Sequence, residues 1–463
     1  MKASRGVLLV ALALLALAAL RDFARLGDAL PWHQLYDFAD FYCAGSALDR
    51  GSDPYRYEPL HRCEHQVSGD AAYASDPARA IPAPLPPYDF PPFMLAARLN
   101  FATARTAGAI AIVVAVAASI AGLALAGVPL EVALLALLLP AGFVLLRAGQ
   151  VVPYALLALV FCGAALARGR TRLAGMLAAL TLIEPHLGLP VCAAMLAWVP
   201  RSRLGLFAAA LALAGIGALM VGVAGLAEYV AAVLPAQAAA ETGYAYQYSL
   251  TYAARTLGTP APASLWIGEL SYALMLLLGV WSGGRSARAL RRPELIAFIP
   301  AACSVVAGPY VHMVDLPFAI PAAAVLACTL RGNLKAVAVV ALCLLAVPWI
   351  PVWIAKKLLL ISLFVVAMLL VRLRPGAAVS IATFIAIAAS VYLLELAPPA
   401  PFQAITEGNF AASDLAQRAW AAYVGALGSA SLAWFAVKIP TWAALVAVVA
   451  LSARVSRRAA AGS

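Results

Sequence analysis

Long apolar runs separated by short basic turns make up most of this chain. An α-helix needs about 20 apolar residues to cross a bilayer, and Lys or Arg marks the cytoplasmic ends of such helices. After a first run at residues 7–20 and a long polar stretch, crossings are predicted at about 104–127, 129–146, 151–167, 204–224, 263–282, 294–308, 314–330, 336–351, 357–371, 377–395 and 439–453. The pattern predicts an all-α polytopic membrane protein of about 12–14 transmembrane or re-entrant helices.

The composition supports this class of protein. Of 463 residues, 64% are hydrophobic and only 11% are charged, which no soluble fold of this length requires. The net charge of +11 comes from basic residues scattered between apolar runs, as in loops that face anionic lipid. We therefore expect membrane lipids, and no nucleic acid, as partners. The first run lacks a cleavage site followed by a soluble domain, so we expect an uncleaved crossing.

Charge also predicts the orientation. Lys2 and Arg5 precede the first run and predict a cytoplasmic N-terminus. The stretch 21–100 holds eleven acidic and seven basic residues, so it is expected outside. We expect a multi-pass protein of the inner (cytoplasmic) membrane. Its predicted regions are a first transmembrane helix (1–20), an extracytoplasmic loop with juxtamembrane helices (21–103), a transmembrane module (104–330), and a C-terminal module (331–463) with an outer loop at 397–437.

The segment 173–199 decides the topology downstream. It is apolar except for EPH at 184–186, and Arg201 and Arg203 follow it. One continuous crossing would place those arginines outside, whereas a hairpin that turns at Pro185 keeps both basic ends inside. The arms are short, which predicts a re-entrant pair buried among other helices. With this hairpin, all five histidines fall at or near the outer face, and titratable groups at several helix ends suggest one composite site there.

Seven cysteines indicate no metal framework. Five of them lie in apolar runs and are expected to be buried as small hydrophobic residues. Cys43 and Cys63 share the predicted outer loop, where a disulfide and two free thiols are both open, because spacing alone fixes no connectivity.

A family resemblance enters at the polar stretch after the first run. Its sequence DFADFYCAG (37–45), followed by ALDRGSDPY (47–55), resembles the opening signature of glycosyltransferase family 87. Members of that family are polytopic enzymes of the GT-C superfamily that transfer mannose from polyprenyl-phosphate-mannose. The resemblance implies a GT-C-type bundle with an extracytoplasmic loop after the first helix, and it implies that Asp37 is the catalytic carboxylate.

The chemistry of Asp37 agrees with that role. An inverting sugar transfer needs a base that takes the proton of the acceptor hydroxyl, while a phosphate leaves without acid assistance. The alternative is that Asp37 caps a juxtamembrane helix. Asp40 lies one helical turn further on, where family members more often carry an apolar residue, and either shares the site or faces water.

Two further motifs follow along the chain. YDFPP (88–92) resembles the aromatic-Pro-Pro entry into the family's second crossing, and is also a rigid stop before a membrane helix. Gly149-Gln150 matches the family's Gly-Gln. The amide of Gln150 is expected either to hydrogen-bond a sugar or to cap the turn.

The EPH motif at 184–186 matches the family's Lys-Pro turn with one departure. Glu184 stands where a Lys is usual, so the chain lacks that cation for the donor phosphate. Arg255 follows YSL (248–250) with the family's spacing and is the expected substitute, since a guanidinium binds phosphate with two hydrogen bonds. The alternative is an arginine that snorkels to the membrane interface.

The last motif, PYVHMVDL (309–316), resembles the family's Ser-Pro-His-x-His-x-Tyr-Asp-Leu. His312 and Asp315 are three residues apart, so at a helix end they share one face. Such a pair orients an imidazole toward a sugar hydroxyl or a phosphate oxygen.

Together, these motifs predict transfer of a hexose, implied to be mannose, from a polyprenyl-phosphate sugar to a lipid or glycan acceptor at the outer face. The resemblance implies inversion, no nucleotide-sugar and no required metal or other cofactor. Asp37 is the expected base, and the expected substrate-binding residues are Asp40, Gln150, Glu184, His186, Arg255, His312 and Asp315. The alternatives are a transporter or flippase of lipid-linked glycans, and a degenerate member that binds a lipid-linked sugar without turnover.

Overall fold

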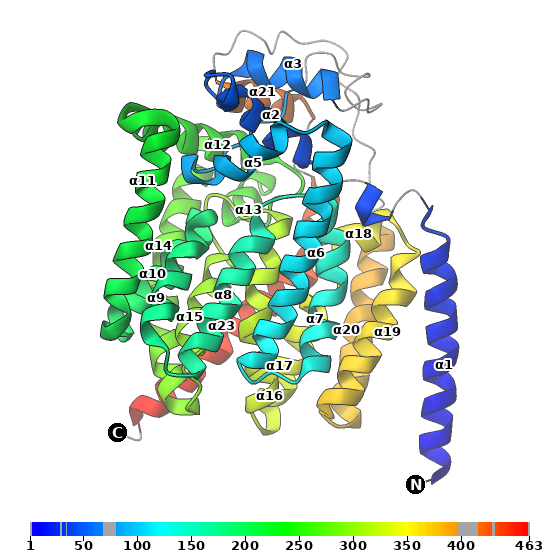
Figure 1. The fold of residues 1–463 in the computed structure, drawn as a ribbon. Helices are drawn as coiled ribbons and strands as arrows, with labels where there is room; N and C mark the ends of the chain where they lie inside the picture. Colours follow the sequence, from blue (N-terminus) through cyan, green and yellow to red (C-terminus); the bar gives the residue numbers. More distant parts are fainter. Residues whose placement is uncertain are drawn as a thin grey trace.

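A bundle of helices standing side by side forms the body of the protein (Figure 1). The computed structural model describes residues 2–27, 30–33, 35–67, 80–396, 415–427 and 431–461. Across these ranges there is no β-strand, and extended pairing is limited to two isolated bridges, Arg56 with Leu415 and Gln247 with His312. The predicted class, an all-α membrane protein, is the class observed. Most of the predicted outer loop at 397–437 lies outside the described residues, and only its helical parts are considered below.

Within the described ranges, most elements follow one another with short connections. The N-terminal part comprises α1 (Lys2–Ala24), η2 (Pro31–His33), α2 (Phe38–Asp49), α3 (Tyr57–Val67), η3 (Pro87–Asp89), α5 (Phe90–Ala97), α6 (Phe101–Leu125), α7 (Leu130–Pro140), η4 (Ala141–Leu146) and α8 (Val152–Ala167). The central part comprises α9 (Thr171–Leu180), η5 (Thr181–Ile183), α10 (Pro185–Trp198), η6 (Pro200–Ser202), α11 (Arg203–Glu228), η7 (Tyr229–Val233), α12 (Leu234–Ala240), η8 (Glu241–Gly243), α13 (Leu250–Thr256) and α14 (Ala261–Leu290). The C-terminal part comprises α15 (Leu295–Ser304), η9 (Met313–Ala319), α16 (Ile320–Thr329), α17 (Gly332–Leu345), α18 (Trp349–Ile354), α19 (Leu358–Leu373), α20 (Ala377–Leu396), α21 (Ala416–Leu427), α22 (Leu432–Ala436) and α23 (Ile439–Ala461).

Several of these helices are long and apolar enough to cross a membrane. In the described part of the chain there are five, at Phe101–Leu125, Pro200–Gly243, Ala261–Leu290, Ala377–Leu396 and Leu432–Arg458. Leu211, Leu219 and Val223 of α11 are 74%, 82% and 78% exposed, which suits contact with lipid rather than water. Shorter apolar helices such as α8, α10, α15 and α16 pack between the long ones and supply the buried core. The predicted apolar runs agree with these elements to within a few residues at most ends.

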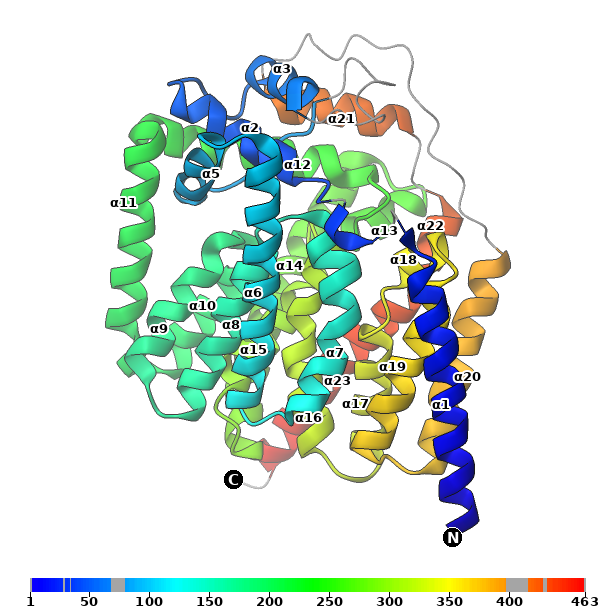
Figure 2. The ribbon, with the colours of Figure 1, turned by 45° about the vertical axis from the view of Figure 1, so that its right-hand side comes forward.

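The two ends of the bundle differ in structure. Helices α2, α3, α5, α12 and α21 lie across one end, and we call these five helices the polar cap (Figures 1 and 2). Both termini lie at the opposite end, which we call the terminal end. Helix α21, from the C-terminal region, packs against α12 and α3. The segments after the first helix and before the last helix therefore build one cap together.

The predicted hairpin is present at α9 and α10, which pack against each other. Near its tip, a Cβ added to Gly188 would lie 2.6 Å from the carbonyl oxygen of Thr181. Near its base, a Cβ added to Gly175 would lie 2.1 Å from the carbonyl oxygen of Ser202. The two arms are thus in backbone contact at the tip, α9 also contacts the turn that follows α10, and the chain enters and leaves the hairpin at the same end.

We predict that residues 204 and 288 face the same compartment, the cytoplasm. At the terminal end the guanidinium of Arg288 lies 4.6 Å from the ring of Trp198, which is close to the start of α11. Single cysteines introduced at 204 and 288 should be protected from a membrane-impermeant maleimide in intact spheroplasts and become labelled after permeabilisation. Labelling of one position but not the other from outside would contradict the hairpin topology.

Within the polar cap, a disulfide joins Cys43 of α2 to Cys63 of α3, with their Cα atoms 5.6 Å apart. Of the two alternatives that the spacing left open, the structure has the bonded one. The bond closes a loop with a sequence separation of 20 residues. In the chain-entropy model a loop of this size contributes about 3 kcal/mol to the free energy of unfolding. It therefore fixes α2, which carries Asp37 at its start and Asp40 in its first turn, within the cap.

Candidate active site

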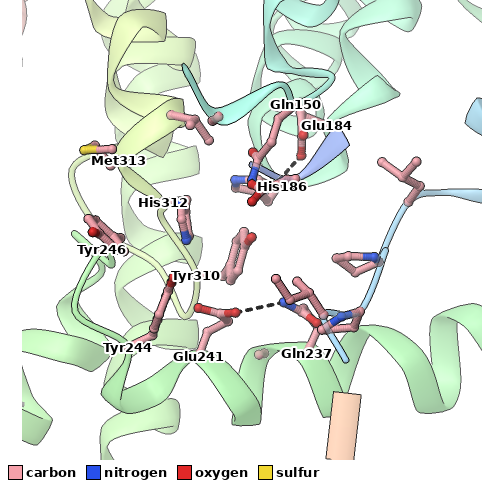
Figure 3. A pocket seen from close by; sticks show the side chains of 18 of the residues that line it. Gln150, Glu184, His186, Gln237, Glu241, Tyr244, Tyr246, Tyr310, His312 and Met313 are labelled. Carbon is pink, nitrogen blue, oxygen red and sulfur yellow. Dashed lines mark hydrogen bonds and ion pairs between the residues drawn. The ribbon is translucent and has the colours of Figure 1, made fainter. Parts of the chain in front are cut away.

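A cavity of about 700 Å³ lies beneath the polar cap. Ligand pockets for small molecules range from about 300 to 1,000 Å³, so its size suits a substrate. Its walls come from α2, the turn before α8, the hairpin tip, the loops at 244–246 and 309–314, and α21. Figure 3 shows Gln150, Glu184 and His186 on one side of the cavity, and Gln237 and Glu241 on the opposite side.

Asp37 is positioned by backbone contacts to the turn before α8. Its N–H donates to the carbonyl of Ala148 at 2.8 Å, and the N–H of Tyr36 donates to the carbonyl of Arg147 at 3.1 Å. Gly149 permits this approach, because its φ is +75° and a Cβ there would lie 3.0 Å from the Cβ of Leu35. The Gly-Gln pair that the sequence singled out is therefore the surface on which the Asp37 segment docks.

The Asp37 carboxylate faces the cavity and accepts a hydrogen bond from the side-chain amide of Gln150. Asp37 is the N-cap residue of α2, yet its side chain makes no capping hydrogen bond to the described first turn of that helix. Of the two predicted roles for Asp37, helix capping is therefore not the one that its side chain performs. Asp40 also lines the cavity but is 1% exposed, whereas Asp37 is half-buried.

At the hairpin tip, His186 lies between two carboxylates. Its Nε2 is 3.1 Å from Asp315 Oδ2, and its Nδ1 is 3.7 Å from Glu184 Oε2. The carbonyl oxygen of His186 accepts a hydrogen bond from the hydroxyl of Tyr272 at 2.6 Å, which fixes the start of α10. Glu184 and His186 line the cavity, whereas Asp315 is 1% exposed and lies behind its wall.

The predicted pairing of Asp315 with the imidazole of His312 needs correction. Asp315 Oδ2 accepts the backbone N–H of His312 at 2.6 Å, and the imidazole it contacts is that of His186. The start of η9 turns as a 3-10 helix, so Asp315 points back at the backbone of its own first turn. The His312 ring lines the cavity, and burial lowers its pKa to about 4, so it is neutral near pH 7.

The structure does not bring Arg255 to the cavity. Its side chain is exposed on α13, and its Nη1 donates to the carbonyl of Thr259 at 3.2 Å. An exposed arginine of this kind agrees with the alternative role for Arg255, that of a side chain that snorkels to the membrane interface. Among the described residues, the Lys or Arg side chain that lines the cavity is that of Arg147, whose guanidinium carbon lies 5.5 Å from the ring centre of Tyr36. The sequence carries a signal for Arg147, since it is a charged residue at the end of an apolar run and directly precedes Ala148-Gly149-Gln150.

Sequence reasoning also missed the residues on the opposite wall. Glu241 begins η8, and Trp420 and Tyr423 lie on α21, in the C-terminal region where no motif was identified. An acidic residue that directly follows a long apolar helix was the available signal for Glu241. The sequence gives no comparable signal for Trp420 or Tyr423, because only the packing of α21 on α12 brings them to the cavity.

The YDFPP motif supports the hairpin tip from outside the cavity. The hydroxyl of Tyr88 donates to the carbonyl of Leu182 at 2.5 Å, two residues before Glu184. Asp89 is buried, and burial raises the pKa of its carboxyl well above the usual value, so it favours the neutral acid. Pro91 and Pro92 lie in the first turn of α5, where proline is tolerated. The motif therefore ends a loop and positions the tip.

Comparisons with protein-family models, with curated proteins and with solved structures find no match to this chain. Within the described ranges, no three His, Cys, Asp or Glu side chains are arranged to hold a metal ion.

Proposed function

We propose that this protein is an integral-membrane glycosyltransferase of the GT-C type. It transfers a hexose, mannose by family resemblance, from a polyprenyl-phosphate sugar to an acceptor at the extracytoplasmic face. One observation carries the proposal. Four motifs that lie far apart in the sequence contribute side chains to one cavity, namely those at 37–45, 149–150, 184–186 and 309–316.

The reaction assigns a step to Asp37. The acceptor hydroxyl oxygen attacks the anomeric carbon from the face opposite the phosphate, and the carbon–oxygen bond to the phosphate breaks with its electron pair. The Asp37 carboxylate takes the hydroxyl proton. The Gln150 amide holds one carboxylate oxygen, so the group has a fixed direction. Because phosphate leaves as a stable anion, no second carboxylic acid is required.

Arg147 is the proposed phosphate-binding residue. It lines the cavity beside Asp37, and its backbone carbonyl already holds the neighbouring Tyr36. A guanidinium can donate two parallel hydrogen bonds to phosphate and remains charged at any physiological pH. The Arg147 Nη2 donates to the Tyr36 hydroxyl at 3.4 Å, a long hydrogen bond that a charged phosphate oxygen would outcompete. Arg147 thereby supplies the positive charge for the donor phosphate that the family's usual lysine would supply at the position of Glu184.

The walls of the cavity suit a substrate with a lipid tail. Leu189 and Val230 line the cavity and are also 49% and 63% exposed on the apolar side of the bundle. The cavity is therefore open toward the surface that contacts lipid. A polyprenyl chain can remain in the bilayer there while its phosphate reaches Arg147, without crossing a polar barrier.

A cryo-EM map of the protein with a short-chain polyprenyl-phosphate analogue tests the proposal. We expect the phosphate within hydrogen-bond distance of the Arg147 guanidinium, and the chain on the Leu189 and Val230 side. A phosphate at the exposed Arg255, or an analogue at the terminal end of the bundle, would contradict the proposed donor site.

A further inference from the structure

Glu241 is a buried carboxylate without an ionic partner. It is 4% exposed and lines the cavity. Its oxygens accept hydrogen bonds from three neutral side chains, Trp420 Nε1 at 2.8 Å, Gln247 Nε2 at 3.0 Å and Gln237 Nε2 at 3.1 Å. Among the described residues, no basic side chain lies within 4.0 Å of it. Buried carboxylates are ordinarily paired with a cation, because removing the charge from water is costly.

Gln237 supplies a second, independent observation at the same place. Gln237 is 7% exposed and lines the cavity, and its Nε2 donates a hydrogen bond to Glu241 (Figure 3). Its Oε1 is buried and has no hydrogen-bond partner. Buried acceptors in native proteins are rarely left without a donor. A carboxyl acceptor and an unsatisfied amide acceptor therefore lie side by side at the cavity wall.

Aromatic rings surround these acceptors. The Tyr244 and Trp420 ring centres are 5.6 Å apart, and Tyr423 stacks on Trp420 with ring centres 5.2 Å apart. All three side chains line the cavity. The faces of such rings attract cations, and groups of rings beside a carboxylate are a recurring means of binding ammonium groups.

We propose that Gln237, Glu241, Tyr244, Trp420 and Tyr423 form an amine-binding pocket that holds a protonated primary amine. An ammonium group has three donors and no acceptor, so it satisfies Gln237 Oε1 and compensates the charge of Glu241 together. A sugar hydroxyl would donate one hydrogen bond but would bring no positive charge to the Glu241 carboxyl. Acidic side chains outnumber Lys and Arg in the described lining of the cavity, which holds Asp37, Asp40, Glu184, Glu241 and Glu269 against Arg147.

The amine is assigned to the acceptor, and this assignment rests on the proposed function. The donor's phosphate belongs with Arg147, on the side of Asp37 and Gln150. Figure 3 shows Gln237, Glu241 and Tyr244 of the amine-binding pocket opposite Gln150. The acceptor would therefore be an amino sugar or a lipid with an aminoalkyl headgroup. Both kinds of acceptor carry a protonated primary amine, and the binding measurements described next distinguish between them.

Binding is measured on the full-length protein without donor, so its outcome is independent of catalysis. In detergent, glucosamine should raise the melting temperature, whereas glucose and N-acetylglucosamine at the same concentration should not. In nanodiscs, phosphatidylethanolamine should stabilise the protein more than phosphatidylcholine if the amine is a lipid headgroup. Amine-selective stabilisation in either the detergent or the nanodisc measurement supports the pocket. The measurement in which it occurs shows whether the bound amine belongs to a sugar or to a lipid headgroup. Equal effects of amines and neutral analogues, or no effect of any amine, would overturn it.

Variants locate the site. Glu241→Gln should weaken amine binding at least tenfold, while Glu131→Gln, the same change at an exposed position paired with Arg372 outside the cavity, should leave it unchanged. Tyr423→Leu removes one ring and touches none of the hydrogen bonds of Glu241, so it should weaken amine binding several-fold even if Glu241→Gln fails to fold. Normal amine affinity in Tyr423→Leu, or in a folded Glu241→Gln, would refute the pocket. If the unmodified protein binds amines but transfers no sugar when donor is supplied, the amine-binding pocket stands and the proposed function is wrong.

Discussion

Replacing Asp37 with Asn is expected to lower sugar transfer by about 100-fold or more while leaving donor affinity nearly normal. The amide keeps the size of the carboxylate and can still contact Gln150, but it does not take up the proton of the acceptor hydroxyl. The measurement is initial-rate transfer from a labelled polyprenyl-phosphate hexose by purified protein in nanodiscs. Donor affinity is measured alongside by thermal stabilisation, to separate chemistry from binding.

Asp40→Asn is the matched control, because it is the same change one helical turn away on α2. It should cost far less than Asp37→Asn, since one base is sufficient and Asp40 is 1% exposed. Equal loss in both folded variants would mean that the two carboxylates act together and that the single-base mechanism is wrong. If transfer survives both changes, the base lies elsewhere. Absence of transfer in the unmodified protein, with the donor bound, would identify a binder without turnover.

Replacing Arg147 with Gln is expected to weaken donor binding by about 10- to 100-fold, since hydrogen bonds to charged groups contribute about 1.5–3 kcal/mol. Arg147→Lys keeps the charge but loses the pair of parallel hydrogen bonds, so its donor affinity should fall between those of the unmodified protein and Arg147→Gln. Competition by an unlabelled polyprenyl-phosphate analogue measures the effect. The loss should be similar for donors that carry different sugars, because the contact is to phosphate.

Arg255→Gln tests donor binding at the residue that the sequence predicted to bind the donor phosphate. Arg255 is exposed and bonds to the carbonyl of Thr259, so its replacement should change donor affinity by less than about twofold. A large loss at Arg255 with none at Arg147 would reverse the assignment. The donor phosphate would then bind outside the cavity, and the proposed function would lose its geometric support.

Local pattern was sufficient for much of the fold. Runs of apolar residues predicted the helices because the bilayer imposes length and polarity on each crossing separately. The short arms at 173–199 and the arginines on both sides predicted the hairpin at Pro185, and α9 and α10 form it. Family spacing singled out Gly149-Gln150, and the close approach of Leu35 shows why glycine is needed there. Each of these inferences depends on residues that are near one another in the chain.

Partners far apart in the sequence were decided only by the tertiary structure. Asp315 contacts the imidazole of His186, 129 positions away, and not that of its neighbour His312. Arg147 and Arg255 look alike in sequence, since each is a single cation at a helix end, yet only Arg147 faces the cavity.

The same holds for the wall that carries Glu241. Helix α21 brings Trp420 to Glu241 across 179 positions, through a contact between two helices of the polar cap. The sequence by itself determined which residues are apolar enough to lie in the membrane and where polar groups interrupt them. Which of those polar groups meet depended on how the helices pack, because side-chain contacts arise from helix rotation and crossing that no local pattern specifies.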